Sequence, residues 1–164
     1  MSKTDVASGP LSVLVVEDDD LSARTLCALL GPDGHRVEVV GNGRVALERL
    51  AAGGRYDLII TDIYMPAMDG IELLRALRRR ADNPAILAIS GGGRTVRVDY
   101  LDLAERLGAH AVLRKPFTRR VLKAAIEEAL AEPAAAAGRR GGVIGPAPAR
   151  GSARSARELA GCAP

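Results

Sequence analysis

Short apolar runs alternate with amphipathic stretches along most of the chain, and polar or glycine-containing turns separate them. Apolar runs of this length are typical of strands buried on both faces, and such strands are usually parallel. The intervening stretches carry apolar residues at helical spacing, as at Ile71, Leu74 and Leu77. The pattern predicts strands over 12–17, 35–40, 57–62, 85–90 and 110–114. It predicts helices over about 20–30, from Asn42 to the Gly53-Gly54 pair, and over about 69–80, 98–107 and 118–131.

Regular alternation of strands and helices predicts an α/β fold, a five-stranded parallel sheet with helices on both faces. Residues 11–131 form this one predicted domain. Residues 1–10 are polar and are expected to be a disordered N-terminal lead. Residues 132–164 are rich in Ala, Gly, Pro and Arg and have almost no large apolar side chain, so we expect a disordered tail.

Composition adds two constraints to this picture. The 164 residues include a single Phe and no Trp, so the core must be aliphatic. The net charge of +3 belongs to residues 132–164, which hold five arginines against two glutamates. The predicted domain is therefore balanced in charge, and we expect no specific binding to nucleic acid.

The N-terminal residues lack the apolar core of a signal peptide, and no apolar run approaches the length of a membrane span. These features predict a cytoplasmic protein without membrane contact. Cys27 and Cys162 match no zinc-binding or CxxC spacing.

Polar side chains follow the apolar runs at the predicted strand ends. Glu17 and Asp18 follow the first run, Asp62 ends the third, Ser90 ends the fourth, and Lys115 follows the fifth. Because the carboxyl ends of parallel strands lie along one edge of a sheet, we expect these groups to converge there. Unpaired carboxylates at such a site would repel one another, and Mg²⁺ is the natural oxygen-ligated cation to neutralise them. The simpler alternative is that the acids of the run 18–20 only cap the following helix. Capping is expected to explain one of them, Asp19 or Asp20, but not the separate acid Asp62.

Asp62 could act as a nucleophile, since a carboxylate can form an acyl phosphate. A bound Mg²⁺ and the ammonium group of Lys115 would then neutralise phosphoryl oxygens. Ser90 and the backbone N–H groups of Gly91 and Gly92 would make a cradle for the remaining oxygen. Pro116 follows Lys115 directly and can fix this loop, including through a cis peptide bond.

Residues 11 to about 131 resemble the receiver domain of bacterial two-component response regulators. The resemblance rests on four segments that occur in the expected order and spacing: 13–18, 61–70, 89–92 and 114–117. It implies a flavodoxin-like fold with strand order 2-1-3-4-5. It also implies that Asp62 is the phosphoacceptor and that Mg²⁺ is held by Asp18, Asp62 and the Tyr64 carbonyl. Glu17 would reach the metal through water, Ser90 would be the switch hydroxyl, and Lys115 would bind the phosphate.

The resemblance implies a stand-alone, single-domain response regulator rather than an enzyme with a separate substrate. A sensor histidine kinase or a histidine phosphotransfer protein would supply the phosphoryl group. Output would pass by phosphorylation-dependent binding of a protein target, through the face formed by residues 98–131, or by a phosphorelay. We expect a monomer or a weak dimer.

One position departs from the family pattern, and two others bear on the lifetime of the phosphoryl group. Val112 stands three positions before Lys115, where the family commonly has an aromatic switch residue. We therefore expect a muted conformational change, or one rerouted through residues 91–100. Tyr64 and Gly92 offer no amide or carboxylate that could orient an attacking water, which predicts slow self-dephosphorylation.

Other interpretations of the same residues stay open. The domain could be a non-phosphorylated docking module, or a phosphatase with an aspartyl nucleophile, although such enzymes of the haloacid dehalogenase type need a second Asp where this chain has Tyr64. Residues 41–46 fit a dinucleotide fingerprint, but they follow the second predicted strand instead of the first, so a turn and a helix cap at Asn42 are favoured. His35 and His110 begin predicted strands away from the acidic cluster and are expected to be ordinary strand-end histidines.

Overall fold

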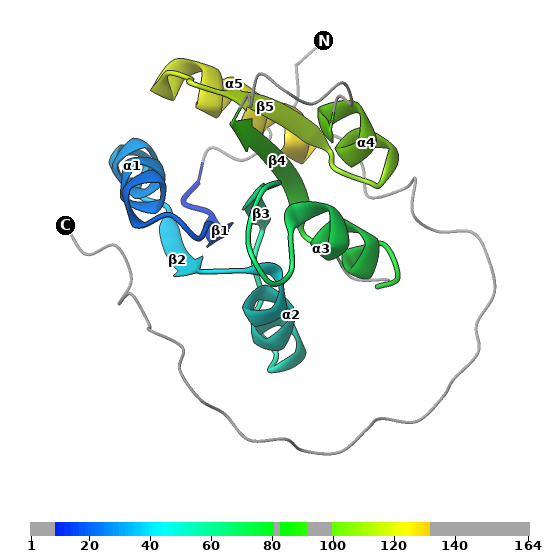
Figure 1. Cartoon of the computed structure of the whole chain (residues 1–164). Coiled ribbons are helices and arrows are strands. Elements are labelled where there is room, and N and C mark those ends of the chain that lie inside the picture. The colour runs from blue at the N-terminus through cyan, green and yellow to red at the C-terminus, as the bar shows by residue number, and fades with distance from the viewer. Residues whose placement is uncertain (1–8, 81–82, 92–99, 132–164) are drawn as a thin grey trace, which may run out of the picture.

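The computed structural model describes residues 9–80, 83–91 and 100–131 (Figure 1). Its strands are β1 (Ser12–Val16), β2 (Arg36–Val40), β3 (Leu58–Asp62), β4 (Ala85–Gly91) and β5 (Ala111–Lys115). Its helices are α1 (Asp20–Leu30), α2 (Gly43–Ala51), α3 (Gly70–Leu77), α4 (Tyr100–Arg106) and α5 (Arg119–Ala131), with a short 3-10 turn, η1 (Gly31–Asp33), after α1. The predictions for residues 1–8, for Gly92 and for the 132–164 tail fall outside the described residues.

All five strands are parallel, and the sheet has the order β2-β1-β3-β4-β5. Val13 of β1 pairs with Val37 of β2 on one side and with Leu58 of β3 on the other. The predicted α/β fold and its flavodoxin-like 2-1-3-4-5 order are therefore confirmed.

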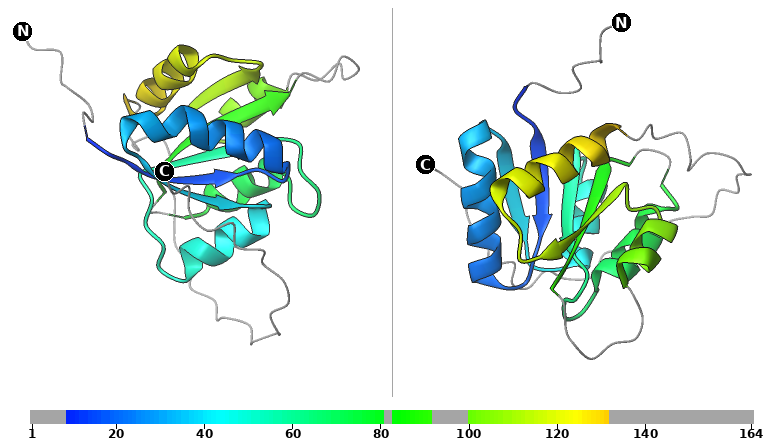
Figure 2. Two further views of the ribbon diagram at one scale, coloured as in Figure 1. Left: turned by 90° about the vertical axis from the view of Figure 1, so that its left-hand side faces the viewer. Right: turned by 90° about the horizontal axis from the view of Figure 1, so that it is seen from above.

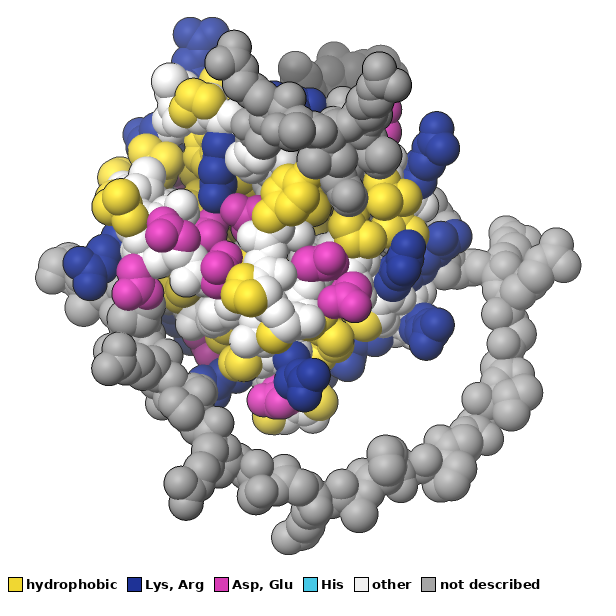
Figure 3. All heavy atoms as spheres, viewed as in Figure 1, with side chains coloured by type: hydrophobic (Ala, Val, Ile, Leu, Met, Phe, Trp, Pro, Cys, Tyr) yellow, Lys and Arg dark blue, Asp and Glu magenta, His cyan; other side chains and the backbone are white. Residues whose placement is uncertain are grey.

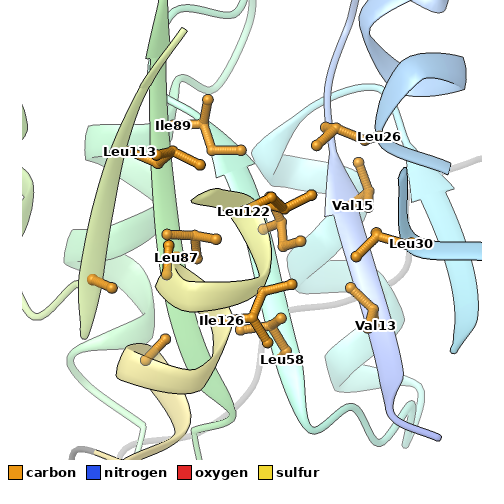
Figure 4. Close-up of a cluster of buried hydrophobic side chains, with 14 of the residues drawn as sticks. Val13, Val15, Leu26, Leu30, Leu58, Leu87, Ile89, Leu113, Leu122 and Ile126 are labelled. Carbon is orange, nitrogen blue, oxygen red and sulfur yellow. The ribbon is translucent and has the colours of Figure 1, made fainter. Parts of the chain in front are cut away.

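Helices cover both faces of the sheet, and Figure 2 (left) shows α1 on one side of β1 and β2 and α2 on the other. Successive side chains of each strand point to opposite faces, so Val13 and Val15 join one buried cluster and Leu14 and Val16 the other. The first cluster lies beneath α1 and α5, where Leu122 packs over the strands (Figure 4). The second lies beneath α2, α3 and α4. Both are aliphatic, as the composition predicts.

The predicted helix caps are present. Asp19 Oδ1 accepts a hydrogen bond from the backbone N–H of Ser22 at 2.7 Å, and Asn42 Oδ1 accepts one from Val45 at 3.1 Å. These carboxylate and amide oxygens satisfy N–H groups that have no partner inside the helix. The turn-and-cap interpretation of residues 41–46 is thus supported.

The predicted ends of several elements differ from the observed ones by a few residues. α3 ends at Leu77 instead of residue 80, because the Arg79 and Arg80 N–H groups bond three residues back, to Ala76 and Leu77. Tightened bonding of this kind closes a helix. β4 extends to Gly91, which the sequence pattern places in a loop.

The two histidines have matching structural roles at the opposite edge from the acidic residues. His35 Nδ1 accepts a hydrogen bond from the backbone N–H of Leu11, and His110 Nδ1 accepts one from Ile86, both at 3.1 Å. Each ring thus ties the start of one strand to its neighbour, as expected of strand-end histidines. None of the helices in the described ranges has the length and apolar character needed to cross a membrane.

Candidate functional site

The carboxyl edge of the sheet brings together groups from β1, β3, β4 and β5. Glu17 directly follows β1, Asp62 is the last residue of β3, and Lys115 is the last residue of β5. Figure 3 shows acidic side chains gathered over this part of the molecule, near the end of β1 and the starts of α1 and α3. The predicted convergence at this edge is therefore seen for residues that are far apart in the sequence.

Lys115 is the centre of the cluster. Its Nζ atom lies 2.7 Å from Asp62 Oδ2 and 2.9 Å from Glu17 Oε2. Both carboxylates are buried, with Asp62 8% and Glu17 4% exposed. A single ammonium group thus compensates two buried negative charges, which leaves the cluster with an excess of negative charge.

Backbone N–H groups orient the other oxygen of each carboxylate. Asp62 Oδ1 accepts a hydrogen bond from Tyr64 at 2.8 Å, and Glu17 Oε1 accepts one from Asp19 at 3.2 Å. Each carboxylate is therefore held between the lysine and the loop that follows its own strand.

Burial raises the pKa of Glu17; the hydrogen bond from Lys115 opposes this shift and the charge of Asp62 adds to it. Burial also works to lower the pKa of Lys115. The hydrogen bonds and charges of Asp62 and Glu17 outweigh that effect, so the net shift of the Lys115 pKa is upward. Lys115 therefore stays cationic at neutral pH.

Ser90 lies in β4, buried to 5% exposure, and pairs in register with Arg114. Gly91 pairs with Lys115, and a Cβ atom added to Gly91 would come within 3.8 Å of Lys115 Cδ. These two predicted cradle residues therefore lie on the strand between β3 and β5. Gly91 belongs to a strand, so the proposed glycine loop does not begin there.

Asp18 differs from its neighbour Glu17, because its side chain is exposed. Within the ranges that the structure describes, no group of three His, Cys, Asp or Glu side chains is arranged to hold a metal ion. Of the three carboxylates expected to converge, Glu17 and Asp62 share the Lys115 ammonium group, while Asp18 is exposed directly after Glu17 in the chain. The chemistry of the donor set nevertheless fits Mg²⁺, since two carboxylates already share one cation, and carboxylate and carbonyl oxygens are the ligands that this ion prefers.

Three further predicted positions are Val112 and Pro116, in and after β5, and Tyr64, after β3. The Lys115-Pro116 peptide bond is cis, as the sequence allowed. Val112 is half-buried and packs against the cluster beneath α2, α3 and α4. Tyr64, by contrast, is 45% exposed beside Asp62.

Sequence reasoning gave no separate role to Thr61 or Gly70. Thr61 is fully buried, and its hydroxyl donates a hydrogen bond to the backbone carbonyl of Asp62 at 2.9 Å. Gly70 begins α3 so close to Asp62 that an added Cβ would overlap the same carbonyl oxygen. A polar residue inside an otherwise apolar strand was the available signal for Thr61.

Comparison with known proteins shows that the chain is similar to response regulators. A family model described as the response regulator receiver domain matches residues 13–127. The chain is 37% identical over 123 residues to response regulator MprA of Mycolicibacterium vanbaalenii, a match covering 74% of this chain and 48% of that protein. It is 35% identical over 119 residues to the transcriptional regulatory protein YkoG of Bacillus subtilis, covering 72% of this chain and 50% of that protein. The chain thus spans about half of the length of these relatives.

Solved structures show the same likeness. The structure of FixJ-N superposes with a TM-score of 0.65 at 31% identity, covering 73% of this chain and 92% of that one. The receiver domain of Francisella response regulator 1452 superposes with a TM-score of 0.64 at 27% identity, covering 73% of this chain and 96% of that one.

Proposed function

This chain belongs to the family of response regulator receiver domains, and from that premise we propose that it is a phosphoacceptor that takes a phosphoryl group on Asp62. The observation that carries the proposal is the placement of the Asp62 carboxylate. It lies at the end of β3, 2.7 Å from the Lys115 ammonium group and oriented by the Tyr64 N–H.

In the proposed reaction an Asp62 carboxylate oxygen attacks the phosphorus of a phosphohistidine. The new O–P bond forms as the P–N bond breaks, and the electron pair of that bond goes to the imidazole nitrogen. Lys115 provides fixed positive charge for the phosphoryl oxygens, and the Ser90 hydroxyl and the backbone at Gly91 and Gly92 provide hydrogen-bond donors. Asp18, Asp62 and the Tyr64 carbonyl would hold Mg²⁺, with Glu17 acting through water. The ion would supply neutralisation of phosphoryl charge.

The proposed donor is a sensor histidine kinase or a histidine phosphotransfer protein. Phosphorylation adds about two negative charges at a cluster that is already acidic, and so biases the balance between two conformations. We place the output surface on residues 98–131, which include α4, β5 and α5. Slow self-dephosphorylation stays a prediction.

A docking module that is never phosphorylated is the second candidate, because no three His, Cys, Asp or Glu side chains within the described residues are arranged to hold a metal ion. A phosphatase is less well supported. The position two residues after Asp62, where a general acid would stand, is Tyr64, and its backbone N–H is already bonded to Asp62.

The deciding experiment is intact-mass analysis after incubation with acetyl phosphate and Mg²⁺. We expect a phosphoryl adduct on the wild type and none on Asp62→Asn. Asp57→Asn is the matched control, because Asp57 precedes β3 at its other end and is exposed. An adduct on Asp62→Asn would assign the chemistry to another residue. Sustained release of phosphate from phosphomonoesters would instead indicate a phosphatase.

A further inference from the structure

The backbone carbonyl of Asp62 lies at the end of β3, where the chain leaves the sheet. The β1–β3 ladder ends with the pair Val16 and Thr61, so Asp62 lies one residue beyond it. On the other side Asp62 pairs with Ile89 of β4, and the Ile63 N–H bonds to the Ile89 carbonyl. The peptide after Asp62 is thus a junction between the sheet and the loop that leads to α3.

Thr61 bonds to this carbonyl from within the core. Its side chain has no exposed surface, and Oγ1 lies 2.9 Å from the Asp62 carbonyl oxygen. A buried hydroxyl without a partner costs free energy, so the hydroxyl is held to this acceptor. Ile59, two positions earlier, belongs to the cluster beneath α2, α3 and α4, and strand alternation places Thr61 on the same face.

Gly70, the first residue of α3, packs against the Asp62 carbonyl from the loop side. A Cβ atom at this position would overlap the Asp62 carbonyl oxygen and would approach Ile63 Cα to 2.8 Å. The Gly70 N–H also donates to the Ile63 carbonyl at 3.0 Å. The first residue of α3 is therefore packed directly on the peptide that follows the phosphoacceptor.

We propose that Thr61 is a positioning residue, which aims the Asp62 carboxylate by fixing the Asp62 main-chain carbonyl against Gly70. The peptide after Asp62 leads through Ile63 to Tyr64, so a rotation of this peptide would move the Tyr64 N–H away from Asp62 Oδ1 and release the carboxylate from its backbone donor. A reacting group displaced by about 1 Å loses much of its rate. This inference rests on the proposed phosphorylation of Asp62.

The test compares Thr61→Val, which keeps the shape and removes the hydroxyl, with Thr61→Ser, which keeps the hydroxyl. Ile60→Val, a buried neighbour in β3, controls for a general loss of core packing. Two quantities are measured on the full chain: the ¹³C′ chemical shift of Asp62 and the dependence of the phosphorylation rate on acetyl phosphate concentration.

We expect Thr61→Val to move the Asp62 ¹³C′ resonance upfield and to lower the maximal rate about fivefold, the equivalent of one hydrogen bond, with an unchanged half-saturation concentration. In Thr61→Ser and Ile60→Val, the Asp62 ¹³C′ shift and the maximal rate should stay near their wild-type values. A wild-type rate and resonance in Thr61→Val would overturn the inference, as would equal losses in Thr61→Ser or Ile60→Val. If the wild type takes no phosphoryl group, the proposed function fails, and the Asp62 resonance alone decides whether Thr61 holds the carbonyl.

Discussion

The Nζ atom of Lys115 lies 2.7 Å from Oδ2 of Asp62, although the two residues are 53 positions apart in the sequence. Glu17 pairs with the same ammonium group, so this one cation links the ends of β1, β3 and β5. Since both acids are buried, removal of the lysine would leave two negative charges close together without compensation.

We therefore expect Lys115→Met to lower the free energy of unfolding by about 2 kcal/mol at neutral pH without Mg²⁺, a value reduced for the partial exposure of the lysine. Asp62→Asn in the Lys115→Met background should recover part of this loss, because it removes one of the repelling charges. Urea unfolding of the two single variants and the double variant measures the coupling. Lys123→Met is the control, since the Lys123 side chain is 58% exposed and lies 3.9 Å from Asp33. Strictly additive effects at Lys115 and Asp62 would contradict the prediction.

The stability of the fold should depend on pH through Tyr56, which lies at the end of the sheet away from Lys115. Burial, and then the hydrogen bond and charge of Glu38, raise the pKa of Tyr56 to about 12 from an ordinary value of 10.0. The hydroxyl donates to Glu38 Oε2 at 2.6 Å. The folded state therefore keeps its phenol proton at a pH where the unfolded chain has lost it. This contribution to stability is fully present below pH 10 and is lost as the pH rises toward 12.

Chemical unfolding between pH 8 and pH 12 tests this expectation when the wild type is compared with Tyr56→Phe, which has no phenol proton. The difference in unfolding free energy between the two proteins should shrink as the pH rises above 10. Glu38→Gln removes the charge of the acceptor, so the loss of the Tyr56 contribution to stability should occur at lower pH. A difference that stays constant over the whole range would show that the hydrogen bond does not stabilise the fold.

The sequence predicted the fold well because the buried strands are short apolar runs and the helices start at side chains that can cap them, such as Asn42. Element ends were less predictable, because pairing with a neighbouring strand decides them. Gly91 belongs to β4 because it pairs with Lys115, which the local pattern cannot show. The strand-end rule placed Glu17 and Asp18 at the same edge, but it could not tell that Glu17 is buried against Lys115 while Asp18 is exposed. Thr61 stands out as a polar residue in an apolar run, but the run does not show that the partner of its hydroxyl is the backbone carbonyl of Asp62.

Ala67 has a backbone conformation that favours glycine. Its φ of 70° lies in the left-handed region, where a Cβ atom is strained. Ala67→Gly should raise the free energy of unfolding by about 0.5–1 kcal/mol, because relief of strain exceeds the added flexibility of the unfolded chain. Ala124→Gly in the exposed face of α5 is the control and should cost about 1 kcal/mol. Thermal unfolding measures the change in stability of both variants. A loss of stability in Ala67→Gly would show that the loop is not strained at this residue.

Gly43 and Gly70 are both too crowded for a side chain, but the obstacles differ. A Cβ atom on Gly43 would lie 2.8 Å from Met68 Cγ and 3.1 Å from Leu73 Cβ, which belong to side chains. On Gly70 it would meet the backbone of Asp62 and Ile63. A side chain can be shortened or can move, whereas the backbone at Asp62 is held by the sheet and by Thr61.

Gly43→Ala should therefore cost about 1–3 kcal/mol, and Met68→Ala should reverse part of that cost in the double variant. Gly70→Ala should cost at least as much, and Met68→Ala should not reverse it. Urea unfolding gives the coupling energies, and acetyl phosphate labelling shows whether Asp62 is displaced. We expect Gly70→Ala to slow labelling more than Gly43→Ala does, because, of these two glycines, only Gly70 touches the backbone of the proposed phosphoacceptor Asp62. Equal rescue of both glycine variants by Met68→Ala would mean that the loop after β3, rather than the Asp62 carbonyl, is what α3 packs against.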